Sequence, residues 1–285
     1  ILFAFALGLN LSAQVPNYVP TDGLVAWYSF NGNGEDSSNN GNDLIKIGDP
    51  SWGDVQGRPF VDLPGNGEHF YHPLDSFPVA EEFSIAMWVR IDVQHGSGNV
   101  GSVMPIASKH YSDAAGSFIL YDNNGTIGGY SHGWELGEWH HLALTISSTS
   151  RNYYFDGALA GGIEDDSWSN TTYPFMIGGW LNQPWWSNNW SNSALSFDGG
   201  IGAVGVWGRV LTAAEVSTVF NESILGCTDS TACNFDSEAT SDYGSCIPSG
   251  CMETEACNYN ALAECEGEAC DYTCCPGPGC CSAGM

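Results

Sequence analysis

Apolar and polar residues alternate through much of the first 225 residues, the pattern of β-strands that rest one face on a core. The clearest case is Phe83–Val93, where every odd position is apolar. Similar segments predict further strands at residues 24–30, 118–121, 139–146, 152–155, 174–180 and 200–207. We therefore expect this part of the chain to be all-β.

Turn residues separate these strands at the spacing expected of a sandwich. Asp156-Gly157 lies between two apolar segments and predicts a hairpin, and Asn123-Asn124-Gly125 predicts a second turn. One short helix among so many strands favours two packed antiparallel sheets. That helix is predicted to begin at the capping box Thr212–Glu215, because apolar Val216, Val219 and Phe220 follow on one side.

The composition changes near residue 226, where a repeat of 24 residues begins. Gly226-Cys227 recurs as Gly250-Cys251, Cys233-Asn234 recurs as Cys257-Asn258, and Cys246 recurs as Cys270. Units this small cannot bury a sizeable core, so we expect disulfides to hold them. The candidates are Cys227, Cys233, Cys246, Cys251, Cys257 and Cys270. All 11 cysteines lie in this part, and their odd number leaves the pairing open.

The first nine residues, ILFAFALGL, form an apolar run that is too short to span a bilayer as a helix. Small and polar residues follow, which is typical of a signal peptide and its cleavage site. A buried N-terminal strand is the alternative. The predicted organisation is a signal remnant at 1–14, a sandwich domain at 15–225 and an acidic, disulfide-rich tail at 226–285. We expect a secreted or cell-surface protein that does not span the membrane.

The charge excludes one class of partner. Lys and Arg number 6 against 33 Asp and Glu, so the formal net charge is −27. Such a surface repels phosphate backbones, and nucleic-acid binding is not expected. Aromatic residues make up 13% of the chain, enough material for a core, so the acidity is not that of a disordered tail.

Several motifs occur in the order found in one known family. They lie at residues 23–33, 36–42, 83–89, 137–145, 153–157 and 197–212. They resemble the strands and turns of laminin-G-like jelly-roll domains of the concanavalin A-like lectin/glucanase superfamily. The resemblance implies a two-sheet antiparallel jelly-roll sandwich with one short C-terminal helix, a fold that hosts lectins, adhesins and hydrolases alike. The tail resembles cysteine repeats of secreted bacterial surface proteins.

In that family, an acidic loop after the first strand and acids on the closing strand can jointly hold Ca²⁺, which prefers several oxygen ligands. The candidates here are Asp36, Asn39, Asn42 and Asp43, with Asp198 opposite. However, Gly202-Ala203 replaces the family's acidic pair on the closing strand. The alternative is that the residues near Asn39 simply form a turn with positive φ.

A loop with four tryptophans is the candidate ligand-binding site. Residues 179–190 follow neither a strand nor a helix period and combine indole rings with amides. Indole faces can stack on sugar rings while amides bind the hydroxyls. The candidates are Trp180, Asn182, Gln183, Trp185, Trp186 and Trp190, with Trp168 and His132 as possible neighbours. The alternative is that the tryptophans cover a sheet edge.

Catalysis is not expected. Retaining glycosidases need two carboxylates about 5 Å apart, whereas the spacing of Glu135 and Glu138 indicates turn residues before Trp139. His140 and His141 are adjacent, so a strand points them to opposite faces, one half-buried and the other exposed, and zinc is not expected.

These observations favour a non-catalytic module that binds a carbohydrate or an adhesion ligand, with Ca²⁺ as a candidate cofactor and a glycan or surface protein as the partner. A divergent glycoside hydrolase and a ligandless spacer of a surface adhesin are the alternatives.

Overall fold

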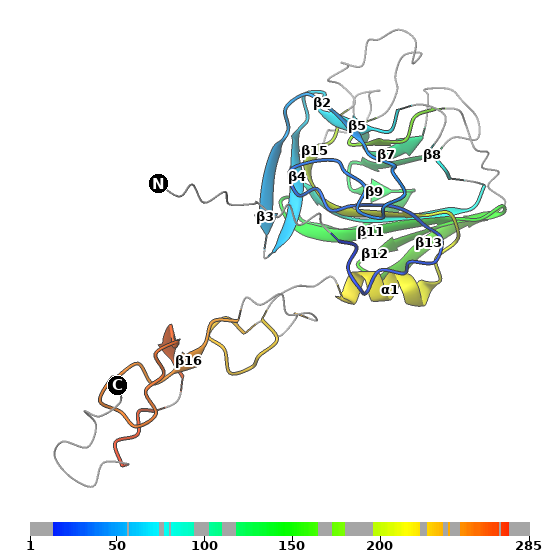
Figure 1. Cartoon of the computed structure of the whole chain (residues 1–285). Helices are drawn as coiled ribbons and strands as arrows, with labels where there is room; N and C mark the ends of the chain where they lie inside the picture. Colours follow the sequence, from blue (N-terminus) through cyan, green and yellow to red (C-terminus); the bar gives the residue numbers. More distant parts are fainter. Residues whose placement is uncertain are drawn as a thin grey trace. The chain divides into compact units, whose positions relative to one another are not determined.

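The computed structural model describes residues 14–55, 57–73, 77–79, 81–93, 103–109, 118–164, 173–179, 196–222, 227–235, 239, 246–267 and 269–273. The chain divides into two compact units, residues 1–220 and 221–285. The first unit is a β-sandwich and the second is the cysteine-rich tail, and each is described by itself (Figure 1).

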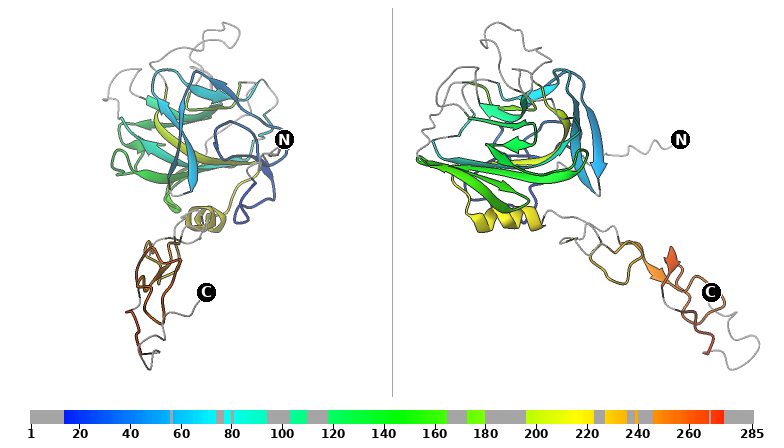
Figure 2. Two further views of the ribbon diagram at one scale, coloured as in Figure 1. Left: turned by 60° about the vertical axis from the view of Figure 1, so that its left-hand side comes forward. Right: turned by 180° about the vertical axis from the view of Figure 1, so that it is seen from behind.

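Two antiparallel sheets form the sandwich (Figure 2). The larger sheet has the order β13-β12-β11-β6-β15-β4-β3, with β1 also paired to β15, and the smaller has the order β10-β9-β8-β7-β14-β5-β2. The strands are β1 (Leu24–Tyr28), β2 (Ile45–Ile47), β3 (Ser51–Val55), β4 (Arg58–Pro64), β5 (His69–Tyr71), β6 (Phe83–Ile91), β7 (Val103–Lys109), β8 (Phe118–Asn123), β9 (Thr126–Ile127), β10 (Tyr130–Ser131), β11 (Trp139–Ile146), β12 (Ser150–Phe155), β13 (Ala158–Glu164), β14 (Met176–Ile177) and β15 (Asp198–Trp207). This arrangement confirms the predicted all-β sandwich.

Strand β15 is the centre of the larger sheet. It pairs with β6 along one edge, and its other edge is shared between β1 and β4. Leu24 of β1 lies opposite Trp207 of β15, so the beginning and the end of the domain are neighbours in one sheet. Gly199 to Ile201 of β15 pair with Leu63 to Val61 of β4.

Strand β6 shows why the alternation predicted only part of the packing. Its odd positions from Phe83 to Ile91 face the core between the sheets, as expected. Its even positions Ser84, Ala86 and Trp88 are buried as well. Helix α1 (Ala213–Glu222) lies under this outer face, where Val216 and Val219 form a second core with Ala86 (Figure 1). The strand is therefore covered on both faces rather than one.

The predicted turns and helix start are confirmed. Asn124 and Gly125 have φ values of 50° and 88°, and Asp156 and Gly157 have φ values of 48° and 74°. Positive φ at two successive residues is what a tight two-residue hairpin turn requires. In the capping box, the Glu215 amide donates to Thr212 Oγ1 at 3.2 Å and the Thr212 amide donates to Glu215 Oε2 at 2.8 Å. In the part of the chain that is described, no helix is both long and apolar enough to cross a membrane.

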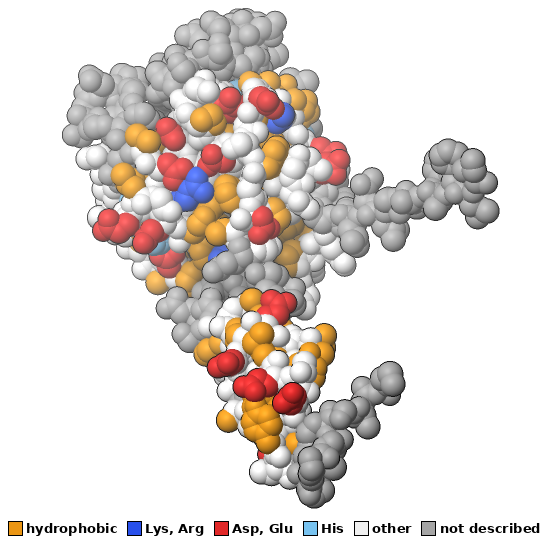
Figure 3. Space-filling model, turned by 90° about the vertical axis from the view of Figure 1, so that its left-hand side faces the viewer, with side chains coloured by type: hydrophobic (Ala, Val, Ile, Leu, Met, Phe, Trp, Pro, Cys, Tyr) orange, Lys and Arg blue, Asp and Glu red, His pale blue; other side chains and the backbone are white. Residues whose placement is uncertain are grey.

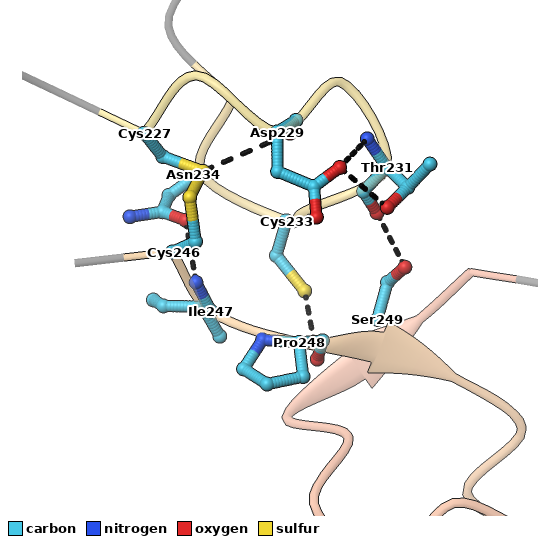
Figure 4. The surroundings of a disulfide bond; sticks show 9 residues. All are labelled: Cys227, Asp229, Thr231, Cys233, Asn234, Cys246, Ile247, Pro248 and Ser249. Carbon is cyan, nitrogen blue, oxygen red and sulfur yellow. Dashed lines mark hydrogen bonds between the residues drawn. A yellow bond between two sulfur atoms is a disulfide. The ribbon is translucent and has the colours of Figure 1, made fainter. Parts of the chain in front are cut away.

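Disulfides hold the tail together. One joins Cys227 to Cys246 (Figure 4). Two others join Cys251 to Cys270 and Cys233 to Cys265. Cys257 is disulfide-bonded as well. The predicted repeat cysteines are thus all in disulfides, and Cys265 is a participant that the repeat comparison missed. The tail's only strands among its described residues are the short parallel pair β16 (Ser249–Gly250) and β17 (Cys265–Glu266).

Candidate binding surface

The tryptophan-rich loop predicted to bind a ligand lies outside the described residues. This holds for Trp180, Asn182, Gln183, Trp185, Trp186 and Trp190, and also for Trp168. His132, the other proposed neighbour, is described, but its side chain is only 2% exposed and is hydrogen-bonded to Asp122 at 2.8 Å. His132 therefore supports the interior of the sandwich and is not available to a ligand.

A different group of aromatic and charged side chains gathers on the outer face of the larger sheet. Four strands contribute one row, because Trp139 of β11 pairs with Arg90 of β6, Arg90 with Gly200 of β15, and Gly200 with Asp62 of β4. Phe60 lies two residues before Asp62 and therefore points to the same face. We call Phe60, Asp62, Arg90, Asp92 and Trp139 the outer-face cluster.

Two glycines make room for the rings of this cluster. The ring centroids of Phe60 and Trp139 lie 5.0 Å apart in an edge-to-face arrangement. A Cβ at Gly53 would lie 2.2 Å from the Phe60 ring, and one at Gly200 would lie 2.6 Å from the Trp139 ring. Both rings therefore extend across positions where any other residue would place a side chain. Each ring remains half-buried, so part of its surface reaches solvent.

Charged groups surround the rings. Arg90 donates to Asp92 through Nε at 2.7 Å and Nη2 at 2.6 Å, and to Asp62 through Nη2 at 2.5 Å. Its guanidinium carbon lies 5.3 Å from the Phe60 centroid and 5.4 Å from the Trp139 centroid. The hydrogen bonds to Asp92, opposed by partial burial and helped by Asp62, hold the pKa of Arg90 above its usual value.

Figure 3 shows the sandwich from the side on which β3 and β4 lie in Figure 1. On this face, hydrophobic side chains lie next to a basic side chain that acidic ones flank (Figure 3). Aromatic rings beside fixed hydrogen-bonding groups are the composition of a sugar-binding surface. The sequence contained a signal for it: Trp88, Arg90 and Asp92 occupy the even, outward positions of Phe83–Val93.

In the loop predicted to bind calcium, the Asp36 carboxylate binds backbone amides. Asp36 accepts hydrogen bonds from the amides of Trp27 at 3.0 Å, Ser38 at 2.9 Å and Asn42 at 3.1 Å. Its own amide donates to Asp43 Oδ1 at 2.8 Å. Asn39 and Gly41 have φ values of 66° and 78°, so the turn with positive φ, the alternative to a metal site, is present.

Asp198 is not brought to this loop. It pairs with Pro64 near one end of β15, whereas Tyr28, which bridges to Asp36, pairs with Val204. Six residues of strand separate the two places by about 20 Å. Among the described residues, no three His, Cys, Asp or Glu side chains are grouped so that they could hold a metal ion. The described residues thus do not fit the calcium site expected from the resemblance.

This loop supplies one prediction. Asp36→Asn is expected to lower the free energy of unfolding by about 1–2 kcal/mol, because the amide retains a single acceptor oxygen for three backbone donors. Asp49→Asn, at an exposed carboxylate, is the control and should change stability little. Thermal unfolding with millimolar Ca²⁺ and with chelator should give the same midpoint. A rise with Ca²⁺ that Asp36→Asn abolishes would restore the calcium hypothesis.

The residues considered for catalysis have structural roles. Glu135 and Glu138 are exposed in a turn closed by the Glu138 amide and the Glu135 carbonyl, with Gly137 at φ 84°, as predicted. His141 is buried on the outer face. The prediction that one of the two histidines is half-buried and the other exposed is only partly right, because neither is exposed. The His140 side chain is 19% exposed, since it stacks on Trp134 and its Nδ1 is 3.0 Å from Asp156 Oδ2.

Comparisons with known proteins agree with the sandwich. A family model described as the concanavalin A-like lectin/glucanases superfamily matches residues 64–217. The comparison with curated protein sequences finds no significant match.

Solved structures with this fold include binding domains. Domain 4 of AbnA, an extracellular GH43 arabinanase of Geobacillus stearothermophilus solved with arabinotriose, has a TM-score of 0.50 and 16% identity over 68% of this chain and 96% of that one. The binding domain of Paraclostridial Mosquitocidal Protein 1 has a TM-score of 0.54 and 15% identity, and the match covers 74% of this chain and 54% of that one. Trypanosoma rangeli sialidase with the inhibitor DANA has a TM-score of 0.52 and 21% identity, and the match covers 71% of this chain and 33% of that one. The chain thus spans about half of the second of these proteins and a third of the third, and the likeness concerns the fold alone.

Proposed function

Because the chain belongs to the concanavalin A-like lectin/glucanase superfamily, we propose that its sandwich is a non-catalytic module of an exported protein and that it binds a glycan on a cell surface or in the surrounding matrix. The observation that carries the proposal is the outer-face cluster, where two half-buried aromatic rings lie beside fixed carboxylates and a guanidinium. The disulfide-bonded tail is in keeping with an oxidising, extracellular environment.

The chemistry of the cluster suits a sugar. The exposed parts of Phe60 and Trp139 offer an apolar surface to the C–H face of a pyranose ring. Asp62 and Asp92 are held in place by Arg90, so their remaining lone pairs can accept hydrogen bonds from neighbouring hydroxyls without a large loss of side-chain entropy.

Hydrolysis, the alternative function, has less support. Retaining hydrolysis needs one carboxylic acid that donates a proton and a second that attacks the sugar. The carboxylates of the cluster both accept hydrogen bonds from Arg90, and Glu135 and Glu138 lie in an exposed turn. A ligandless spacer predicts instead that the sandwich binds no glycan at all.

A glycan array with the whole chain tests the proposal. We expect at least one class of glycan to bind, and Trp139→Ala to weaken that binding about tenfold, since an aromatic contact contributes about 1 kcal/mol beyond its buried area. Leu159→Ala, which alters an exposed apolar side chain on β13, is the control and should bind normally. Thermal unfolding checks that each variant is folded.

Two outcomes of the array contradict parts of the proposal. Binding that survives Trp139→Ala but is lost in Trp185→Ala or Trp186→Ala would move the site to the tryptophan-rich loop. No binding above background, with and without Ca²⁺, would favour the ligandless spacer.

A further inference from the structure

Arg58 differs from three other basic side chains of the sandwich. Lys46, Arg90 and Arg209 each pair with a carboxylate. Across the ranges that the structure describes, Arg58 has no ion pair and no hydrogen bond, and its Nε is buried without a partner. In a chain of net charge −27, an unpaired guanidinium is an exception that calls for a physical reason.

The position of Arg58 places it beside the outer-face cluster. Arg58 is two residues before Phe60 on β4, so both side chains are on the same face, about 7 Å apart along the strand. Its guanidinium carbon lies 4.4 Å from the centroid of the Trp88 ring, which holds the side chain against the sheet. The side chain of Arg58 is partly buried, and this burial lowers its pKa, an effect that Tyr18 partly offsets.

The two arginines on this face differ in what they can still bind. Arg90 is neutralised by Asp62 and Asp92. The partly desolvated Arg58 has no counter-charge, and a carboxylate is the group that its planar fork matches best.

We propose that the glycan bound on the outer face carries a carboxylate, and that Arg58 binds this carboxylate while Phe60 and Trp139 contact the sugar ring. The proposal rests on the proposed function. It names an acidic sugar as the ligand class, and a uronic acid and a sialic acid are two sources of the same chemistry.

The net charge of the chain also predicts how the binding of an acidic glycan depends on salt. The net charge of −27 repels an acidic glycan at long range, and salt weakens that repulsion. The contact with Arg58 is short and partly buried, so salt screens it less. The affinity for an acidic glycan should therefore increase as the salt concentration is raised from low to physiological.

The experiment compares acidic and neutral partners of the same sugar by calorimetry with the whole chain. The pairs are trigalacturonic acid with galactotriose, and 3′-sialyllactose with lactose. We expect the acidic member of one pair to bind at least tenfold tighter than its neutral member. Arg58→Gln should reduce that ratio to about 1, whereas Lys46→Gln, which removes an exposed charge elsewhere, should preserve it. Trp139→Ala should weaken both members equally.

The outcomes separate this inference from the proposed function. Equal affinity for the two members in the unaltered chain would overturn the carboxylate inference and leave glycan binding intact. Absence of binding by either member of both pairs and on the array would overturn both. If Arg58→Gln does not fold, Arg58→Lys retains the charge without the planar fork, and an unchanged ratio in that variant would also contradict the role of Arg58.

A second inference rests on the tail alone. Its two repeats make the same hydrogen bonds 24 residues apart. The Ile247 amide donates to Asn234 Oδ1 and the Asp271 amide donates to Asn258 Oδ1, both at 2.8 Å. Each repeat is also closed by its own disulfide, Cys227–Cys246 or Cys251–Cys270, with the same separation of 19 residues.

A different disulfide joins the two repeats. Cys233 of the first repeat is bonded to Cys265 of the second. Near Cys233, Ser249 Oγ donates to the Thr231 carbonyl (Figure 4). The residue 24 positions before Cys265 is Ser241, so the first repeat lacks the receiving cysteine. Cys257, the equivalent of Cys233, is present in the second repeat and is disulfide-bonded.

We infer that the tail is a directional array in which each repeat is closed by one disulfide and fastened to the following repeat by another. The first repeat donates a linking cysteine and receives none, as the beginning of such an array requires. Phe235 and Tyr259 are 46% and 43% exposed, so a repeat has little core and depends on its disulfides. The array can therefore transmit force through covalent bonds that bypass the backbone between repeats.

Digestion of the unreduced chain with a protease that cleaves after Asp and Glu tests this pairing. We expect a peptide of residues 230–236 linked to residues 265–266, which mass spectrometry separates from a cluster that contains Cys227, Cys246, Cys251 and Cys270. Cys265→Ser should release one thiol at Cys233 and retain the disulfides Cys227–Cys246 and Cys251–Cys270. The sandwich should unfold at the same temperature in that variant, since residues 1–226 contain no cysteine. Cys233 found within the larger cluster would overturn the array.

Discussion

Alanine at position 199 is expected to prevent the sandwich from folding to its native state. Gly199 has a φ of 148°, and a Cβ there would lie 1.9 Å from the carbonyl oxygen of Arg90. That oxygen belongs to the backbone of the neighbouring strand β6, so no side-chain rotation can relieve the clash. We expect a loss of about 4 kcal/mol or more, a large share of the stability of a typical domain.

Gly41→Ala is the matched control for this variant. Gly41 also has a positive φ, 78°, but a Cβ there would meet nothing within 4 Å. Its loss should be about 1 kcal/mol, the conformational term alone. Urea unfolding of both variants, together with their yield of soluble protein, measures the difference. Equal unfolding midpoints for the two variants would show that β15 can move away from β6 at this point.

Acid is expected to destabilise the sandwich well above the pH at which its carboxylates titrate. Burial lowers the pKa of His141 to about 4, against a weaker opposing effect of Asp156. Its ring lies between Trp88 and Phe220, at centroid distances of 5.6 Å and 5.7 Å. Between an unfolded pKa of about 6.5 and this folded value, the unfolded chain binds a proton that the folded chain does not. Stability should therefore fall by about 3 kcal/mol as the pH decreases from about 7 to about 4.

Replacement of His141 by leucine isolates this contribution. The two side chains have similar volumes, and leucine leaves neither ring nitrogen buried without a hydrogen bond. Unfolding free energies measured between pH 4 and pH 7 should lose most of their slope in His141→Leu. A smaller slope should remain, because burial also lowers the pKa of His69, despite its hydrogen bond to the Gly67 carbonyl. An unchanged slope would contradict the assignment.

At lower pH the carboxylate of Asp156 also contributes to the loss of stability. Although burial alone would raise it, hydrogen bonds from the His140 side chain and the His141 amide hold the pKa of Asp156 below its usual value. The stability that this carboxylate contributes is present above its unfolded pKa and is lost as the pH falls further. Asp156 therefore adds to the loss of stability at low pH, but the loss still begins near pH 6.5, where His141 starts to contribute.

Local patterns predicted the parts of the fold that depend on neighbouring residues. The alternation at Phe83–Val93, the turn at Asp156-Gly157 and the capping box Thr212–Glu215 all occur where expected. Strands β2 to β5, between Ile45 and Tyr71, were not identified. They are only three to seven residues long, too short for an alternation to stand out from the surrounding sequence.

The sites depended on contacts that no local pattern contains. Asp36 looks like a metal ligand in the sequence, but three backbone amides use its carboxylate. Phe60 and Trp139 are 79 positions apart, and only the sheet order β11-β6-β15-β4 brings their rings together. The glycines that admit these rings, Gly53 and Gly200, lie on two further strands.

The sequence by itself determined that this chain is an antiparallel sandwich with one helix and a repeating, disulfide-bonded tail, because strand alternation, turn conformation, helix capping and a 24-residue period are properties of residues close in the chain. Only the tertiary structure decided which side chains share a surface and which cysteine joins one repeat to the next. Those choices depend on strand order and register, which are set by the packing of the whole core rather than by any segment of it.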